Sequence, residues 1–332
     1  MTLTQNMRVL SVESDTDRED LARFCDYLIK MGNGELKTDS TGGIKIPDRF
    51  LLPPNDPLGL LKWVYGDKPE PLPEEKSCSK AVYNNILDKN IKYYGDKAIL
   101  CPKNFDVNKM NEDILQTLPG EGRVCLSADA VMHGDDQGLY VTTEFLNKID
   151  LSGLPPHHLR IKIGCVMMLL RNLNPKHGLC NGTRLIVTHT TSRLIKGIIL
   201  TGSHQGTKCI IPRITVYPSN NPYAFKWGRR QFPLQHAYVM TINKSQGQTF
   251  RRTGLLLPMA CFAHGQLYVA FSRCGYPPND MENTGLKVVV YDTPIQGQRQ
   301  SMGGVRTNDT EGITTQNIVL KEVFKNVKNH GC

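Results

Sequence analysis

The spacing of apolar residues changes near residue 158, and this change constrains the fold more than any other feature. From Leu159 onward "LRIKIG" alternates strictly, and "CVMMLLRNL", "TRLIVTHT", "LIKGIILTG" and "TKCIIPRITVYP" follow at short intervals. Closely spaced strands of this kind, with Asn181–Gly182 in a turn, are typical of a small β-barrel or meander. Residues 158–217 are therefore predicted to form an all-β insertion.

The chain before this insertion alternates between helix and strand. Helices are predicted over residues 13–34, 78–94 and 106–118, and a short buried strand over 97–101, stopped by Pro102. The first helix places a run of side chains on one face, namely Leu21, Phe24, Cys25, Leu28 and Ile29. Residues 38–75 are rich in Gly and Pro and predict an irregular connection. The alternation predicts an α/β sheet.

The same alternation returns after the insertion. A strand is predicted over residues 233–242, and it leads into "NKSQGQT", which predicts a turn or short helix. Further strands are predicted over 254–258, 286–292 and 317–324, and a helix over 263–273. The length of 332 residues fits two domains, or one large domain with an insertion.

Charge is distributed unevenly along the chain. Residues 1–150 hold 18 Lys/Arg and 25 Asp/Glu, residues 151–279 hold 16 Lys/Arg and no carboxylate, and residues 280–332 hold six of each. A stretch of 129 residues without a carboxylate creates positive potential, which favours nucleic acid or nucleotide as the partner. The alternative is a basic surface that serves only solubility. This segment also lacks the carboxylates that usually hold Mg²⁺ at a phosphate.

Three classes of protein are disfavoured. The chain has no run of about 18 apolar residues, so no membrane span is predicted. The N-terminus "MTLTQNMRVL" lacks the apolar stretch of a secretory signal. The ten cysteines are scattered singly, without CxxC, and predict reduced thiols and no metal site.

The stretch "TINKSQGQTF" carries the clearest chemical signal. It follows a predicted strand and brings polar side chains together with a glycine. Its candidate phosphate-contacting residues are Thr241, Lys244, Ser245, Gln246 and Gly247. Backbone N–H groups can approach a phosphate at small residues, while a Lys supplies a point charge and hydroxyls and amides supply hydrogen bonds. The alternative is a solvated polar turn.

Other cations are candidates for binding. Arg273 ends a mostly apolar helix, so it could reach a γ-phosphate or simply complement the helix C-terminus. Arg8 is uninformative on its own. A second group interleaves cations with the aromatic residues Phe225, Trp227 and Phe232, an arrangement that suits single-stranded nucleic acid. Its cations are Lys226, Arg229, Arg230, Arg251 and Arg252. The alternative is a set of core aromatics beside a solvated basic face.

These residues carry a resemblance to a known family. "YVMTINKSQGQTF" followed by "CFAHGQLYVAFSR" resembles motifs V and VI of superfamily 1 helicases, in the Pif1-like branch that includes Helitron transposon proteins. "LTQNMR" is similar to motif IV, and "GLPPHHLRIKIGCVMMLLRNLNPKHGLCNGTRLIV" resembles the entry into the SH3-like 2B insertion. The segment "RRQFPLQHAY", which leads into motif V, and the segment "NIVLKEVF", near the usual end of the family's sequence, fit the same pattern. The resemblance covers residues 2–327.

The resemblance implies a RecA-like α/β domain (2A) over residues 1–157 and 218–332, interrupted by an SH3-like β-barrel (2B) over 158–217. It implies ATP-driven 5′→3′ translocation on single-stranded DNA and unwinding at duplex junctions. Arg8 and Arg273 would contact the γ-phosphate, and the loop from Thr241 to Gly247 would couple DNA to nucleotide. Lys226, Trp227, Arg229, Arg230 and Arg251 would contact DNA. The resemblance also implies an intracellular location, in the nucleus or the mitochondrion, and roles in DNA repair, recombination, telomere maintenance or transposition.

The sequence departs from the family in one respect. No GK[ST] occurs in the 332 residues, and neither the Walker A motif nor the acidic Walker B pair of the family's domain 1A is found. We therefore expect this chain to hydrolyse no ATP alone, with the Mg²⁺ ligands in a missing domain 1A. The competing interpretation is a transposon remnant or a stand-alone module that binds single-stranded DNA without ATP.

Overall fold

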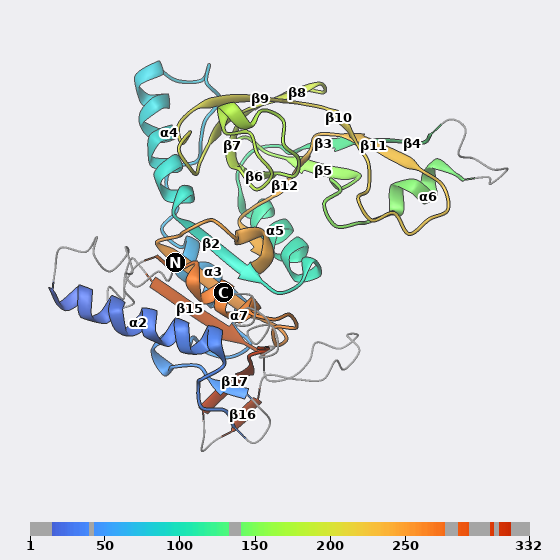
Figure 1. Ribbon diagram of the computed structural model, residues 1–332. Helices are drawn as coiled ribbons and strands as arrows, with labels where there is room; N and C mark the ends of the chain where they lie inside the picture. The colour runs from blue at the N-terminus through green and yellow to red at the C-terminus, as the bar shows by residue number, and fades with distance from the viewer. Residues whose placement is uncertain are drawn as a thin grey trace, which may run out of the picture. The chain divides into compact units, whose positions relative to one another are not determined.

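The computed structural model divides the chain into two compact units (Figure 1). Unit 1 comprises residues 1–67, 96–109 and 239–332, and unit 2 comprises 68–95 and 110–238. The residues that the structure describes are 15–39, 43–132, 141–275, 285–291, 306–308 and 312–319. The predicted boundaries at residues 157 and 217 do not coincide with the borders of these units, and the assignment of domains 2A and 2B stays a prediction.

Unit 1 is built on a parallel sheet of four strands in the order β13-β2-β14-β15. The strands are β13 (Val239–Thr241), β2 (Lys97–Cys101), β14 (Arg252–Leu257) and β15 (Gly285–Val290). Their side chains are almost all buried, as expected of a parallel sheet covered on both faces. The predicted α/β class is confirmed.

Aromatic side chains join the helices of unit 1. Phe24 of α2 (Asp15–Asn33), Phe50 of η1 (Asp48–Phe50) and Phe271 of α7 (Gln266–Ser272) form edge-to-face pairs with ring centroids 5.9 and 6.0 Å apart. Such pairs stabilise a core beyond the area that they bury. The end of α7, where Arg273 follows, is therefore held firmly in the unit.

The prediction of irregular structure over residues 38–75 is wrong in part. The helix α3 (Pro57–Tyr65) lies there, because Pro57 occupies the first turn and the Asp56 side chain accepts a hydrogen bond of 2.7 Å from the Gly59 N–H. A further antiparallel sheet joins β1 (Gly43–Lys45), β17 (Gly312–Gln316) and β16 (Arg306–Asn308). Residues 317–319 are not in a strand, and the rest of the strand predicted over 317–324 lies outside the described residues.

The predicted β-rich segment forms a five-stranded antiparallel sheet in unit 2, in the order β12-β6-β7-β8-β9. The strands are β12 (Leu234–His236), β6 (Val166–Leu169), β7 (Arg184–Thr190), β8 (Leu194–Ile199) and β9 (Lys208–Pro212). One apolar cluster runs through all five strands. The closed SH3-like barrel stays a prediction, because the strand pairings establish the sheet and not its closure.

Unit 2 also holds a second sheet, in the order β10-β11-β4, with the short helix α6 (Thr143–Lys148) beside it (Figure 1). Its strands are β10 (Ile214–Val216), β11 (Trp227–Gln231) and β4 (Ala128–Val131). Strand β3 (Arg123–Leu126) precedes β4 and pairs with β5 (His158–Ile161). Helices α4 (Lys80–Gly95) and α5 (Asn104–Thr117) confirm two predicted helices.

The strand predicted over residues 233–242 is two strands. Strand β12 pairs with β6, and β13 pairs with β2 in the parallel sheet of unit 1. Ala237 and Tyr238 lie between them, both fully or almost fully buried, and the Val166 N–H donates to the Tyr238 hydroxyl over 3.0 Å. Hydrophobic pattern alone does not reveal such a break, because the intervening residues are apolar as well.

The predictions about membrane spans and cysteines can be compared with the described residues. None of the helices described is long and apolar enough to cross a membrane. Nine cysteines lie in the described part of the chain; none of these nine is in a disulfide, and most are buried. Burial raises the pKa of the Cys165 and Cys261 thiols to about 12, so these groups behave as small apolar residues.

Candidate functional site

The loop that follows β13 begins at the carboxyl end of the parallel sheet. Thr241 is the last residue of β13 and lies opposite Cys101, the last residue of β2. The chain then turns through η3 (Ile242–Ser245). In open parallel sheets this edge is where ligands bind, because helix N-termini and loop N–H groups converge there.

Within this loop, some side chains support its shape and others face solvent. The Ser245 side chain is fully buried, and its hydroxyl donates to the Ile242 carbonyl over 2.6 Å. Gln246 and Gly247 are exposed, and Lys244 is half-buried. The structure therefore gives Ser245 a supporting role and leaves Lys244, Gln246 and Gly247 accessible.

Gly247 has a left-handed backbone, with φ of 79°. Apart from Gly247 and its two chain neighbours, none of the described residues comes within 4 Å of the position that a Cβ at residue 247 would occupy. The glycine is therefore required for the turn and not for close packing. Among the described residues, the loop backbone at Gly247 is therefore open to the approach of a ligand atom.

Arg273 joins the C-terminal end of α7 to this loop. Its Nε donates to the Val269 carbonyl over 3.0 Å, one Nη donates to the Gln248 carbonyl over 3.1 Å, and the other donates to the Ser272 hydroxyl over 2.8 Å. The Phe250 N–H donates to the Arg273 carbonyl over 2.9 Å. The structure thus brings together Arg273 and the loop, which are far apart in the sequence. The guanidinium also caps α7, which was the alternative interpretation.

The residues of this loop fit a phosphate and do not fit a metal ion. A Lys, an Arg, backbone N–H groups and an amide supply positive charge and hydrogen-bond donors, which are the groups that hold phosphates. Magnesium prefers carboxylate oxygens, and residues 151–279 contain none. Any nucleotide bound here would thus receive its Mg²⁺ ligands from elsewhere. Arg8 lies outside the described residues.

One carboxylate near this edge of the sheet escaped the sequence analysis. Asp106 lies in the first turn of α5, directly after β2, and is 5% exposed. Its Oδ2 atom is buried and has no hydrogen-bond partner among the described residues, and burial raises the pKa of this carboxyl above its ordinary value. The sequence signal was weak, because Asp is also common in the first turn of ordinary helices.

The five predicted DNA contacts fall into two groups. Lys226, Arg230 and Arg251 are exposed, as a phosphate contact requires. Trp227 and Arg229 are each 1% exposed. The prediction that these two side chains contact DNA is therefore replaced by a structural role, because a side chain buried within unit 2 has no surface to offer a nucleic acid.

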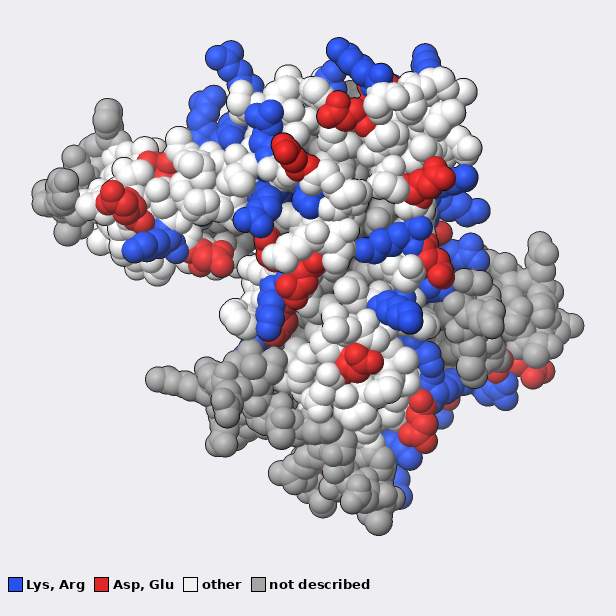
Figure 2. Space-filling view, turned by 180° about the vertical axis from the view of Figure 1, so that it is seen from behind, with Lys and Arg blue, Asp and Glu red and all other residues white. Residues whose placement is uncertain are grey.

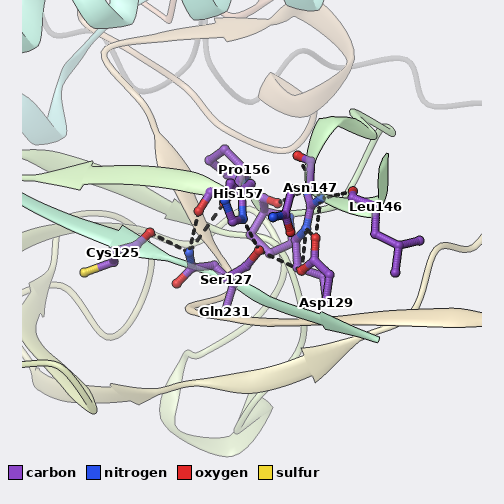
Figure 3. A network of polar contacts seen from close by, with 10 residues as sticks. Cys125, Ser127, Asp129, Leu146, Asn147, Pro156, His157 and Gln231 are labelled. Carbon is purple, nitrogen blue, oxygen red and sulfur yellow. Dashed lines mark hydrogen bonds and ion pairs between the residues drawn. The ribbon is translucent and has the colours of Figure 1, made fainter. Parts of the chain in front are cut away.

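Arg229 belongs to a buried polar network, of which Figure 3 labels Ser127, Asp129, Leu146 and His157 among others. Its Nε and Nη atoms donate to the Asp129 carboxylate over 2.9 and 2.7 Å, and to the Pro155 and Leu146 carbonyls over 3.1 and 2.8 Å. The Ser127 hydroxyl donates to Asp129 over 2.6 Å and lies 2.7 Å from the His157 Nδ1. The network joins β4, β11, α6 and the segment before β5.

This arrangement does not form a Ser-His-Asp catalytic triad. Ser127 lies between the two other groups, so the carboxylate contacts the hydroxyl and not the imidazole, whereas a triad needs the imidazole in the middle. Burial, with the neighbouring His158 as a second cause, lowers the pKa of His157. The network is best explained as support for the second sheet.

Carboxylates from the acidic first half of the chain neutralise part of the basic segment. Asp129 pairs with Arg229, and Glu112 pairs with Arg160 over 2.6 Å. Over the face drawn in Figure 2, Lys and Arg are interspersed with Asp and Glu rather than gathered in one continuous patch. Positive potential is therefore expected at particular elements and not over the whole surface.

Comparison with known proteins agrees with this architecture. The family described as "DNA helicase Pif1, 2B domain" matches residues 144–190, which run from α6 through β7. This match begins before residue 158, where the insertion was predicted to start. It includes Leu146, Pro155 and His157 of the buried network, so the network lies partly within the matched family segment.

Curated relatives and a solved structure extend the likeness beyond this segment. The human ATP-dependent DNA helicase PIF1 is 29% identical over 203 residues, which are 58% of this chain and 27% of the human protein. The rat protein of the same name is 30% identical over 199 residues, 59% of this chain and 28% of the rat protein. This chain thus spans little more than a quarter of the length of these relatives.

The crystal structure of Pif1 helicase from Candida albicans has the same fold, with a TM-score of 0.52. The superposition covers 96% of this chain and 60% of that chain at 20% identity, so the likeness concerns the fold alone. The family match over residues 144–190, the curated relatives and the shared fold thus agree with the resemblance to Pif1-like superfamily 1 helicases that the motifs predict.

Proposed function

We propose that this chain is the C-terminal part of a Pif1-like helicase, in which it couples ATP hydrolysis to 5′→3′ translocation on single-stranded DNA and to duplex unwinding. The observation that carries the proposal is the contact between Arg273 and the loop after β13, at the carboxyl end of a parallel sheet. The curated relatives are ATP-dependent DNA helicases by name.

In this proposal the loop senses DNA on one side and nucleotide on the other. Lys244 and Gln246 supply a charge and an amide to a DNA phosphate, and Gly247 leaves the backbone open to it. The Nη atom of Arg273 that donates to the Gln248 carbonyl would donate to an oxygen of the γ-phosphate instead. Because one guanidinium would then serve both partners, a change at the phosphate would be transmitted to the loop.

ATP would be held between this chain and a domain 1A that carries the Walker A and Walker B motifs. The chain contains no GK[ST], and the loop offers no carboxylate for Mg²⁺. A bound nucleotide would supply the free energy of hydrolysis, and Arg273 and Lys244 of this chain would stabilise negative charge on the transferred phosphoryl group. The DNA track would include Lys226, Arg230 and Arg251, which are exposed.

The family also frames the biological setting of this proposal. We place the protein in the nucleus, with the mitochondrion as the alternative, in repair, recombination, telomere maintenance or Helitron transposition. The competing function is a binding module or transposon remnant without ATP hydrolysis. The two differ in their response to nucleotide, because a binding module holds DNA with a steep salt dependence and no effect of ATP.

The test is a DNA-stimulated ATPase assay on the chain alone and on the chain fused to a Walker A-bearing domain 1A of a Pif1-like helicase. We expect activity only in the fusion, and a loss of about 10³-fold or more on Arg273→Ala, as for other arginine fingers. Ser272→Ala is the matched control, because it removes the hydroxyl that accepts a hydrogen bond from Arg273 and keeps the guanidinium. ATPase activity that survives both Lys244→Ala and Arg273→Ala would refute the site.

A further inference from the structure

The second sheet of unit 2 has an outward face that the sequence analysis did not single out. Along β4 and β10 buried and more exposed residues alternate, and along β11 Arg230 is exposed between the buried Arg229 and Gln231, while Gly228 is covered by the Tyr217 ring. The inward side carries Asp129, Val216, Trp227 and Arg229, next to α6. The outward side carries Ala128, Ala130, Met132, Thr215, Tyr217, Lys226, Gly228 and Arg230. We call these eight residues the outer face.

Tyr217 is the one aromatic residue of the outer face, and it is held in place before any ligand arrives. Its side chain is 53% exposed. A Cβ at Gly228 would lie 2.8 Å from the Tyr217 Cε1 and 3.1 Å from the Cδ1, so the ring packs directly on the backbone of β11. Arg171 donates to the Tyr217 carbonyl over 3.2 Å and fixes the end of β10. A base that stacks here would pay little to order the ring.

Charge on the outer face has a single sign. Lys226, directly before β11, and Arg230, within it, are both exposed and lie two residues on either side of Gly228. None of the eight residues is a carboxylate. The acid of this sheet, Asp129, faces inward and is neutralised by Arg229. The face is therefore complementary to a chain of phosphates.

Small residues keep the outer face flat. Ala128 and Ala130 on β4 add only methyl groups to the face, and Gly228 on β11 lets the Tyr217 ring lie directly on the backbone. A flat surface with one exposed ring and flanking cations suits extended nucleotides, whose bases stack and whose phosphates pair with Lys and Arg. A protein partner would more commonly need a pocket or a continuous apolar patch.

We propose that the outer face is a stacking platform for single-stranded DNA, on which one base stacks on Tyr217 and the neighbouring phosphates contact Lys226 and Arg230. This inference rests on the proposed function, because it assumes that the chain acts on DNA. It adds Tyr217 and Gly228 to the predicted DNA track. It also explains how Trp227 and Arg229 serve binding without contact, since they support the face from below.

Fluorescence anisotropy of the full chain with a labelled oligothymidylate of about 20 nucleotides, longer than one small β-fold binding site, tests the platform. We expect Tyr217→Ala to raise Kd about tenfold, and Tyr217→Phe to leave Kd near the wild-type value, because stacking needs the ring and not the hydroxyl. The matched control is Phe145→Ala. Phe145 is 44% exposed in the same unit but lies on α6, on the other side of the sheet.

The salt dependence gives a second readout that a structural defect would not imitate. Replacing both Lys226 and Arg230 with Ala should reduce the slope of log K against log salt by about 1.4, since each phosphate contact on a single strand contributes about 0.7. Photo-crosslinking of the wild-type chain to an oligonucleotide with 5-iododeoxyuridine should label Tyr217. This measurement needs no variant and therefore does not depend on the stability of one.

The outcomes separate the platform from the proposed function. DNA binding by the wild-type chain, with Kd unchanged in Tyr217→Ala and crosslinks only at other residues, overturns the platform and leaves the proposed function standing. No DNA binding by the wild-type chain overturns both. Tighter Tyr217-dependent binding to oligouridylate than to oligothymidylate overturns the assignment to DNA and points to RNA.

Discussion

The buried pair of Arg229 and Asp129 allows a quantitative test of how unit 2 is held together. Their side chains are 2% and 0% exposed, and three hydrogen bonds of 2.7 to 3.1 Å join them. Asp129→Asn keeps the shape and removes the charge, which leaves a guanidinium buried without its counter-ion. Removing one partner of such a pair costs about 3–5 kcal/mol. We expect about 3 kcal/mol, because the Leu146 and Pro155 carbonyls still accept from Arg229.

The assay is urea unfolding followed by the fluorescence of Trp227. This ring lies 5.5 Å from the Arg229 guanidinium, so it reports on the same part of unit 2. The chain has two tryptophans, and Trp63→Phe removes the one in unit 1. With a slope of about 1–3 kcal/mol per molar urea, the loss should lower the midpoint by about 1–3 M.

The matched control is Glu112→Gln, which removes the partner of Arg160. That pair is 49% and 42% exposed, and an exposed pair contributes about 1 kcal/mol or less. A double variant with Asp129→Leu and Arg229→Met should be less destabilised than Asp129→Asn, since it leaves no buried charge. Equal shifts in the Asp129 and Glu112 variants would refute the reasoning, because burial would then make no difference to the two pairs.

Three further predictions concern single side chains. Asp106→Asn should raise the melting temperature at neutral pH and have little effect near pH 3, because burial raises the pKa of this carboxyl and the folded state therefore disfavours its charged form. Thermal unfolding of the wild-type chain and the variant from pH 3 to pH 7 measures the difference between their melting temperatures. A difference that does not change with pH contradicts the prediction. Burial lowers the pKa of His236 from 6.5 to about 4, so the free energy of unfolding should fall as the pH drops from about 6.5 to about 4. In His236→Gln the free energy of unfolding should depend less on pH over this range. An unchanged pH dependence in the variant argues against His236 as its cause. Asp56→Ala should cost about 1 kcal/mol through loss of the cap on α3, measured by urea unfolding with Trp63 as the probe, and an unchanged midpoint would show that the cap adds nothing.

Local pattern was sufficient for most elements of the chain. The helix over Asp15–Asn33 and the strands from β5 to β9 follow directly from periodicity, because the buried face of each element repeats with its own period. The pattern failed where apolar residues were continuous. It merged β12 and β13 into one strand, although the two strands belong to different sheets.

The candidate site shows the same division. Motif spacing directed attention to Lys244, Gln246 and Arg273, and the structure joins the loop to Arg273 through carbonyl contacts. Composition could not tell an exposed Arg from a buried one. Arg229 and Arg230 are adjacent in sequence, yet one is 1% exposed and bound to Asp129 while the other is exposed.

By itself, the sequence determined the class of fold, the carboxylate-free basic segment and the likeness to Pif1-like helicases, because these depend on local periodicity, composition and motif order. Only the tertiary structure decided which cations meet a carboxylate and which meet solvent. The partner of Arg229 lies 100 residues away, on β4, and strand pairing places the two side chains on the same inward face. The same pairing turns Arg230 outward, since neighbouring residues of a strand point to opposite sides of a sheet, and Tyr217 and Lys226, which directly follow β10 and precede β11, are exposed as well.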